Sequence, residues 1–262
     1  MTRFAEVELQ RERWRRALER LALDTDDRPD FARRGLASRL RVATVQLLLL
    51  PSDPEAAPVT IDGDLAARYQ GRQSIGLGDL NVALPFNPRR TAHALAVVDH
   101  YETDWNYYYA LHRSGAVEFG LGDVGGWEGA DSSGDLPRMI FLSPTVARVW
   151  ALLALASEAY EHSEVSGPYQ LTIAVPNVRG ALLGRLSEGW SEPHDWNNRV
   201  GPCLDANLLW HLEIDELPDA DRARAIAFSV GDRIEEAWGS QQQRYLAHRG
   251  DHAGQLDPRT IN

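Results

Sequence analysis

The chain has 262 residues, of which 44% are hydrophobic and 25% charged, with a net charge of -11 and one cysteine, Cys203. A single cysteine excludes an intramolecular disulfide and a cysteine-rich zinc site, and the acidic balance argues against broad contact with a nucleic-acid backbone. Every one of the 27 basic residues is an arginine, which excludes the lysine of a Walker A loop and the amine nucleophile of Schiff-base enzymes.

Three regions are predicted: an amphipathic helix over residues 1–24, a single α+β domain over 25–250 and a disordered tail over 251–262. The helix carries apolar side chains at the spacing of a narrow helical seam, which consists of Phe4, Val7, Trp14, Leu18 and Leu21. An exposed apolar strip is a liability on an acidic protein, so it packs either on its own domain or on another chain. Our hypothesis is that it binds a protein partner or a second copy.

The domain is expected to open with a strand over residues 39–50, rich in leucine and β-branched side chains and ended by PSDPEAAP. A weakly patterned connection follows over 63–92 and contains a short helix near 64–70. Its glycine-rich stretch 71–80 lacks the lysine and the spacing of a phosphate-binding loop. We interpret that stretch as an ordinary loop.

Three strands are predicted next, over residues 93–101, 105–112 and 116–121, with a tight turn at 113–115 between the last two. The second of these strands is unusually aromatic, which suits either a hairpin core or a platform for stacked bases. The charged residues nearby are acidic rather than basic: Asp99, Glu102, Asp104 and Glu118. The hairpin core is therefore favoured, with Asp99–Asp104 as a solvated turn, and 122–138 is expected to be a flexible loop.

A long apolar helix is predicted to open at Ser143-Pro144 and to lie buried at the centre of the domain. A strand over 169–175, an alternating strand over 207–215 and an amphipathic helix over 218–239 complete the domain. Strands follow one another and helices are few, without the βαβα alternation of a doubly wound fold. The predicted fold class is α+β, a mainly antiparallel sheet with helices packed on one face.

Candidate catalytic side chains occur in two places. The loop 187–198 contains Ser191, His194 and Asp195 between two tryptophans, Trp190 and Trp196, which could bind a ligand. On the strand over 207–215, His211 and Glu213 share one face and could act as a base and its orienting group. Ser191 does not lie in the G-x-S-x-G turn of a hydrolase, and an ordinary loop and an ordinary polar pair are the simpler interpretations.

Nucleic acid is expected to bind only through a partner or through a local arginine patch, which would have to gather Arg33, Arg34, Arg39, Arg41, Arg89 and Arg90. The strongest apolar run, residues 42–50, is far shorter than the roughly 18 residues of a membrane helix. The N-terminal residues lack the apolar segment of a secretory signal. We therefore expect a cytoplasmic protein without membrane contact, metal or cofactor.

In the order of its elements the chain resembles the region that follows the nucleic-acid-binding domain in prokaryotic Schlafen/AlbA-2-type ATP-binding proteins. The likeness covers roughly residues 5 to 240, and its points are the charged helix, the strand ending LLLLPSDP, the hairpin ALHRSGAVEFG, the long helix and the strand LTIAVPNVRGA. The AlbA-like domain of that family is absent, so no nucleic-acid-binding or catalytic residues carry over. The resemblance implies an accessory module of a regulatory or antiviral defence system.

The function expected from these observations is a non-catalytic interaction, scaffold or sensor subunit of a prokaryotic assembly. The alternative is a hydrolase that uses His194 and Asp195 of the 187–198 loop together with His211 and Glu213.

Overall fold

The computed structural model describes residues 45–51, 59–77, 80–90, 94–101, 104–121, 139–175, 178–184, 201–206, 208–216 and 219–239. The chain divides into two units, Met1–Leu40 and Arg41–Asn262, and all described residues belong to the second. The described helices are α3 (Gly63–Tyr69), α4 (Leu142–His162) and α5 (Ala220–Ala237). The described strands are β1 (Val45–Pro51), β2 (Arg72–Leu77), β3 (Leu80–Phe86), β4 (Arg89–Arg90), β5 (Ala94–Tyr101), β6 (Asp104–His112), β7 (Val117–Leu121), β8 (Met139–Phe141), β9 (Tyr169–Val175), β10 (Leu182–Gly184) and β11 (Leu208–Ile214).

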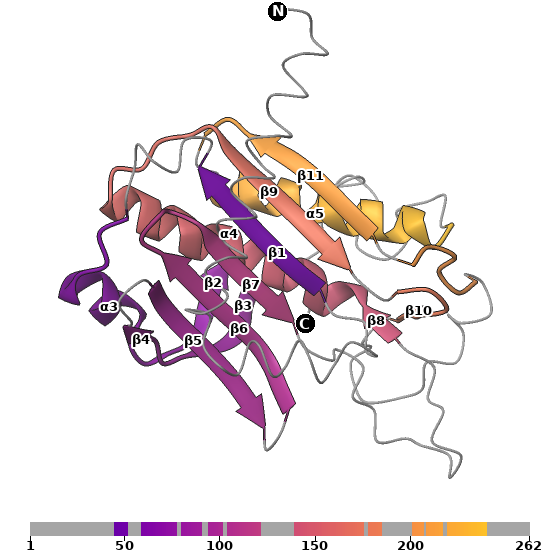
Figure 1. Cartoon of the computed structure of the whole chain (residues 1–262), viewed down its shortest axis with the longest axis horizontal. Coiled ribbons are helices and arrows are strands. Elements are labelled where there is room, and N and C mark those ends of the chain that lie inside the picture. The colour runs from indigo at the N-terminus through magenta and orange to yellow at the C-terminus, as the bar shows by residue number, and fades with distance from the viewer. Residues whose placement is uncertain are drawn as a thin grey trace, which may run out of the picture. The chain divides into compact units, whose positions relative to one another are not determined.

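The main sheet has seven strands in the order β11-β9-β1-β7-β6-β5-β4, and every neighbouring pair in it is antiparallel (Figure 1). β1 is an interior strand of this sheet, so Leu49 faces Val117 of β7 on one side and Leu171 of β9 on the other. β5, β6 and β7 form a meander that returns to β1. The expectation of an α+β fold with a mainly antiparallel sheet is confirmed for this part of the chain.

The turn between β6 and β7 closes as the sequence predicts. The backbone N–H of His112 donates to the carbonyl of Ala116 at 2.8 Å, and the N–H of Gly115 donates to the carbonyl of His112 at 2.9 Å. Gly115 has φ of 86°, a left-handed conformation that glycine adopts without steric cost. Tyr109 of β6 is fully buried, so the prediction that this strand contributes core is confirmed at that residue; the side chains of Trp105 and Tyr107 lie outside the described residues.

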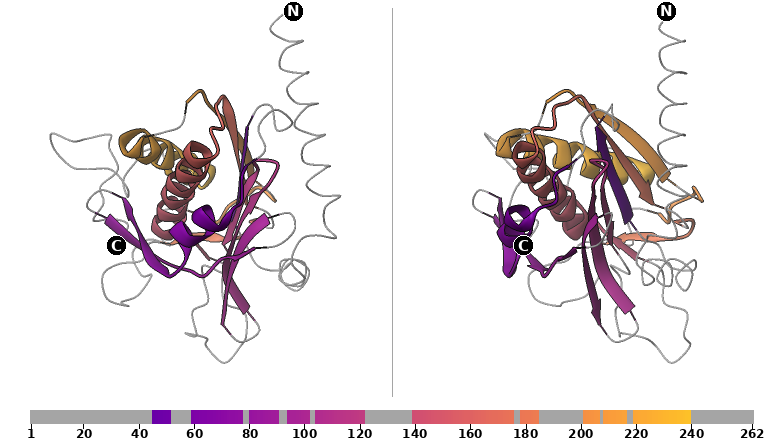
Figure 2. Two further views of the ribbon diagram at one scale, coloured as in Figure 1. Left: turned by 90° about the vertical axis from the view of Figure 1, so that its left-hand side faces the viewer. Right: turned by 60° about the vertical axis from the view of Figure 1, so that its left-hand side comes forward.

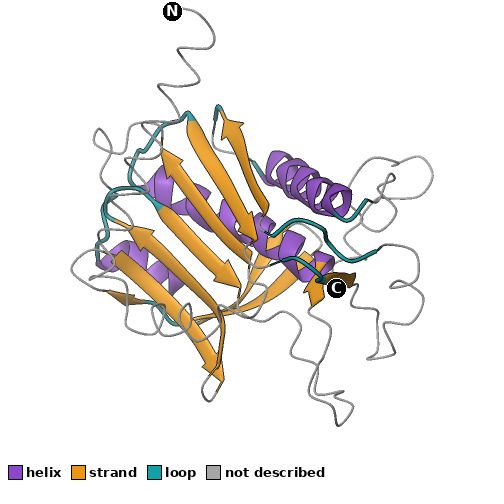
Figure 3. Ribbon diagram, turned by 45° about the vertical axis from the view of Figure 1, so that its right-hand side comes forward, coloured by secondary structure: helices purple, strands orange, loops and turns teal. Residues whose placement is uncertain are grey.

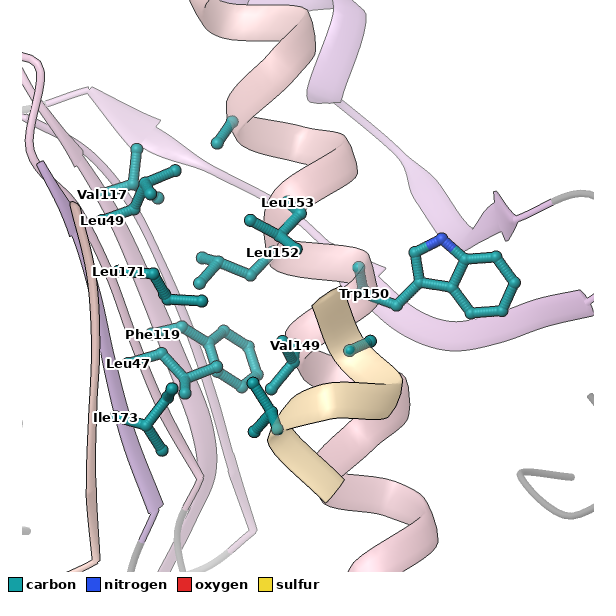
Figure 4. Packing of buried hydrophobic residues seen from close by; sticks show 14 of the residues in the cluster. Leu47, Leu49, Val117, Phe119, Val149, Trp150, Leu152, Leu153, Leu171 and Ile173 are labelled. Atoms are coloured by element: carbon teal, nitrogen blue, oxygen red, sulfur yellow. The ribbon is translucent and has the colours of Figure 1, made fainter. Parts of the chain in front are cut away.

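Helix α4 is the centre of the hydrophobic core. Side chains from β1, β7 and β9 point at it from the sheet: Leu47, Leu49, Val117, Phe119, Leu171 and Ile173 (Figure 4). Leu152 and Leu153 of the helix face these strands, whereas Trp150 points away from the sheet and is also buried. Since α4 is apolar on nearly all sides, it can be covered all round, and the prediction of a central buried helix is confirmed.

Helix α5 packs beside α4 on the same side of the sheet (Figures 2 and 3). The side chain of Asp219 caps its first turn by accepting a hydrogen bond from the N–H of Arg222 at 2.8 Å. Its buried apolar side chains recur at helical spacing and are Ala223, Ala227, Phe228, Val230 and Ile234. We call the face of the sheet turned toward α4 the inner face and the opposite one the outer face.

The interpretation of residues 71–80 as a loop is wrong. β2 and β3 form an antiparallel hairpin of their own, which lies on the side of α4 remote from the main sheet (Figure 2). Both terminal nitrogens of Arg72 donate to Glu158 of α4, at 3.0 and 2.8 Å, and tie the hairpin to the helix. Glycine at 76 and 78 lowers the strand propensity of this segment. The sequence pattern therefore does not predict the hairpin, which packs against α4. The short parallel pair β8–β10 was likewise not predicted.

Candidate functional site

The strand β11 forms one edge of the main sheet. Its one neighbour among the described strands is β9, with which it pairs without a break from Leu208 opposite Val175 to Ile214 opposite Tyr169. Alternate residues of an edge strand direct their backbone N–H and C=O groups away from the sheet, and such a row can pair with a further strand. At the other edge β4 has two residues, too few to serve as a comparable template.

The side chains of β11 alternate between the two faces as the sequence predicts. Leu208 and Ile214 are buried on the inner face, and Trp210 and Leu212 between them are half-buried against the core. The other three residues are exposed on the outer face: Leu209, His211 and Glu213. Leu209 is 60% exposed, one of the largest exposures of an apolar side chain in the described part of the chain.

Natural edge strands are commonly protected by lysine, proline or a bulge, because an open apolar edge invites pairing with other chains. The sequence of β11, LLWHLEI, contains neither proline nor arginine, which supplies all 27 Lys/Arg-type basic side chains of this chain, and its pairing with β9 shows no register shift. Glu213 is its only formally charged residue at neutral pH. β11 therefore has the features of an edge strand that can pair with a further strand from another chain.

The expected pair of His211 and Glu213 is confirmed to lie on one exposed strand face. His211 directs Nδ1 to the hydroxyl of Thr172, which lies directly opposite on β9, at 3.0 Å. A base within reach of a hydroxyl is one half of a nucleophilic pair. Thr172, however, is only 6% exposed. A buried hydroxyl in mid-strand does not meet a substrate, and we interpret the contact as a cross-strand pair that holds β11 to the sheet.

The remaining predicted site residues belong to two segments of the chain that the structure does not describe. The loop 187–198, with Trp190, His194, Asp195 and Trp196, lies outside the described residues, and so does the N-terminal seam of Phe4, Val7, Trp14, Leu18 and Leu21. Within the described ranges, histidine, cysteine, aspartate and glutamate form no group of three or more that could hold a metal ion. The hydrolase hypothesis therefore stays a prediction.

Two members of the predicted arginine patch are described, and they do not share a surface. Arg89 pairs with Ala96 and Arg90 with Leu95, so the two side chains leave β4 on opposite faces of the sheet. The guanidinium of Arg90 lies near Gly63 at the start of α3. Arg33, Arg34, Arg39 and Arg41 lie outside the described residues.

Several polar contacts that the sequence does not indicate join distant elements. His162 at the end of α4 lies 3.2 Å from the carboxylate of Asp62, which also caps α3 by accepting a hydrogen bond from the N–H of Leu65 at 2.8 Å. That backbone hydrogen bond is the main cause that lowers the pKa of Asp62, with His162 adding to it. His112 and Glu118 approach to 3.5 Å across the β6–β7 hairpin. The positions of these contacts between elements point to a structural role.

Buried tyrosines form a second set of structural contacts. The hydroxyl of Tyr69 donates to the carbonyl of Leu155 at 2.7 Å, and that of Tyr160 donates to the carbonyl of Gly115 at 2.7 Å. The rings of Tyr160 and Tyr169 stack with centroids 5.1 Å apart. Burial raises the pKa of both Tyr69 and Tyr160. Their hydroxyls therefore keep their protons and serve as donors, not as bases.

Comparisons with protein-family models, curated proteins and solved structures yield no match to this chain. Among the helices that the structure describes, none combines the length and apolar composition that crossing a bilayer requires. The geometry of β11 thus carries the functional argument.

Proposed function

We propose that the chain is a non-catalytic interaction subunit that binds another polypeptide by strand addition to β11. The observation that carries this proposal is the edge itself, seven residues in unbroken register, with an exposed leucine and no arginine or proline. In strand addition the main-chain hydrogen bonds supply affinity and the alternating side chains supply specificity.

The side chains on both faces of β11 suit such a partner. Trp210 and Leu212 offer a partly covered apolar surface on the inner face, continuous with the core. On the outer face Leu209 lies beside His211, so an added strand meets one apolar and one polar position. Covering the exposed part of Leu209 contributes about 1–2 kcal/mol, given that full burial of a leucine is worth about 1.5–3 kcal/mol.

The setting we propose is a prokaryotic regulatory or defence assembly in which the chain acts as a scaffold or sensor. The support for this setting is the sequence resemblance to the Schlafen/AlbA-2-type accessory region. The N-terminal seam is proposed as a second contact with a protein partner.

The test compares two leucines of similar character. Leu209→Lys places a charge on the edge of β11, where the side chain is already exposed, so the fold is expected to survive. Leu204→Lys is the matched control, because Leu204 is 83% exposed and lies outside any strand. Each purified variant is used to capture proteins from an extract of the native host, with the wild-type chain alongside.

A protein that the wild type and Leu204→Lys capture but Leu209→Lys loses supports binding at β11. Equal capture by all three chains contradicts it. Circular dichroism and urea unfolding of the variants check that a loss of capture does not come from a loss of fold.

A further inference from the structure

We propose that the strand added to β11 is β11 of a second copy, so that the chain forms a two-fold dimer with His211 on the axis. This inference rests on the proposed function, since it names the partner of the same edge. In such a dimer the two main sheets become one continuous antiparallel sheet, and both copies of α4 and α5 lie on the same face of it.

The alternation of side chains restricts where the axis can pass. A two-fold axis perpendicular to the sheet pairs residues that lie at equal distances on either side of it. If the axis passes level with one residue, that residue lies opposite its own copy, and inner side chains pair with inner ones. If the axis passes midway between two consecutive residues, each inner residue would lie opposite an outer one. His211 is the middle residue of Leu208–Ile214, so an axis there pairs the whole strand.

The apolar residues of β11 are arranged symmetrically about that axis. On the inner face Trp210 lies opposite the second copy's Leu212, and Leu208 lies opposite its Ile214. Trp210 and Leu212 are the two inner residues that remain half-buried at the edge. By symmetry the Trp210–Leu212 pair occurs twice in the dimer, so both residues of both copies are covered. Aromatic–aliphatic cross-strand pairs of this kind stabilise antiparallel sheets.

Charge is compatible with the same axis. With His211 central, Glu213 lies opposite the apolar Leu209 of the second copy and diagonally beside its His211, a neighbour of complementary charge when the imidazole is protonated. An axis through Glu213 would place two carboxylates face to face, which destabilises a sheet. An axis through Leu209 would leave His211, Leu212, Glu213 and Ile214 without opposite residues on β11. An axis through Leu212 would pair His211 with Glu213 directly but leave Leu208 and Leu209 without opposite residues on β11, so only the axis at His211 pairs all seven residues.

The symmetry of the proposed dimer is the one most often found among protein oligomers. Two-fold isologous contacts are the most frequent kind, because one self-complementary surface suffices. Each copy carries a net charge of -11, so the two copies repel at long range. Salt at physiological strength screens this repulsion over about 8 Å, and the association is expected to strengthen as salt is raised toward that level.

The experiment uses the full chain and cysteine substitutions along β11. The native Cys203 is buried, so it is kept and the wild type serves as the background for cross-linking. In His211→Cys the two introduced residues lie directly opposite, with Cα atoms about 4.5–5.5 Å apart, inside the range of about 4.4–6.8 Å that a disulfide spans. A covalent dimer is expected under mild oxidation.

Glu213→Cys and Leu209→Cys are the matched controls on the same face of the same strand. In each of them the two introduced cysteines are offset by four residues, about 13 Å along the strand, so neither variant cross-links alone. A mixture of the two is expected to cross-link, because residue 213 of one copy lies opposite residue 209 of the other. No other register gives this combination.

Sedimentation velocity completes the test. The wild type and Leu204→Glu are expected to be dimers and Leu209→Glu a monomer, because residue 209 lies opposite Glu213 of the second copy and the substitution sets two carboxylates face to face. A wild type that stays monomeric at every concentration, or cross-linking in Glu213→Cys alone, overturns the inference. Suppose that the wild type is monomeric, and that a partner captured by the wild type is lost only by Leu209→Lys. The self-pairing is then wrong and the proposed function stands. If capture too is unaffected by Leu209→Lys, both are wrong.

Discussion

The substitution Gly167→Ala should destabilise the protein strongly, although alanine is usually a mild replacement. Gly167 lies just before β9, against the chain that leaves the end of β11. A Cβ atom at Gly167 would lie 2.3 Å from the carbonyl oxygen of Asp215 and 2.9 Å from the ring of Tyr169. The nearest obstacle is backbone, so it cannot turn aside as a flexible side chain would.

The size of the destabilisation follows from how closely the new Cβ atom would approach the carbonyl of Asp215. Ordinary contacts of Cβ atoms begin at 3.4 Å, so the new methyl group is 3.4 − 2.3 = 1.1 Å too close to the carbonyl of Asp215. Inserting a methyl group into a packed site costs about 1–3 kcal/mol, and the upper end applies because two strand ends must separate. A loss of 3 kcal/mol lowers the Tm by about 6–12 °C in a domain of this size.

Urea unfolding followed by tryptophan fluorescence measures the loss, and Gly201→Ala is the control. A Cβ at Gly201 meets nothing within 4 Å, so that variant should stay within about 0.5 kcal/mol of the wild type. Equal midpoints for the two alanine variants would refute the close approach of Gly167 and Asp215 on which the reasoning depends.

Three further predictions concern buried and capping groups. Tyr160→Phe removes the hydrogen bond to the buried carbonyl of Gly115 and should cost about 1–2 kcal/mol of unfolding free energy; an unchanged urea midpoint would contradict it. The pKa of Asp62 is lowered, chiefly by the N–H of Leu65, so its charge stabilises the fold above the ordinary aspartate pKa and this contribution is lost as the pH falls through the lower folded value. Asp62→Asn keeps a capping side chain, and its unfolding free energy should vary less with pH than that of the wild type between about pH 2 and 5; parallel curves would count against the assignment. Burial raises the pKa of the Cys203 thiol, so a thiol reagent should label the native chain far more slowly than the urea-unfolded chain, and rapid native labelling would show that the site is open.

Most of the main sheet could be predicted because the sequence pattern within each strand is enough to identify it. The strand 169–175 was predicted with its observed bounds, and the alternation in 207–215 indicated both the strand and its two faces. The long helix was recognisable from an apolar run behind Ser143-Pro144. These signals arise within a few residues of the chain, where periodicity and capping act.

The missed elements depend on contacts between distant residues. β2 and β3 gain their stability from α4, for example through Arg72 and Glu158, which are 86 positions apart in the sequence. The place of β11 at the edge was beyond prediction for the same reason. The sequence indicates that His211 and Glu213 share one face of the strand, but whether a strand has one neighbour or two depends on which other strands reach it.

The interior position of β1, between β9 and β7, has a consequence for how the chain folds during synthesis. β1 leaves the ribosome before both of its neighbours, and its pairing of Leu49 with Val117 and with Leu171 must wait for each of them. Closing loops of that length is slow compared with forming a helix or a hairpin. Until then an apolar strand has no partner in the sheet, a period in which nascent chains aggregate or are captured by chaperones. Shortening the segment that separates β1 from β7 in the sequence should therefore speed folding more than strengthening any single strand.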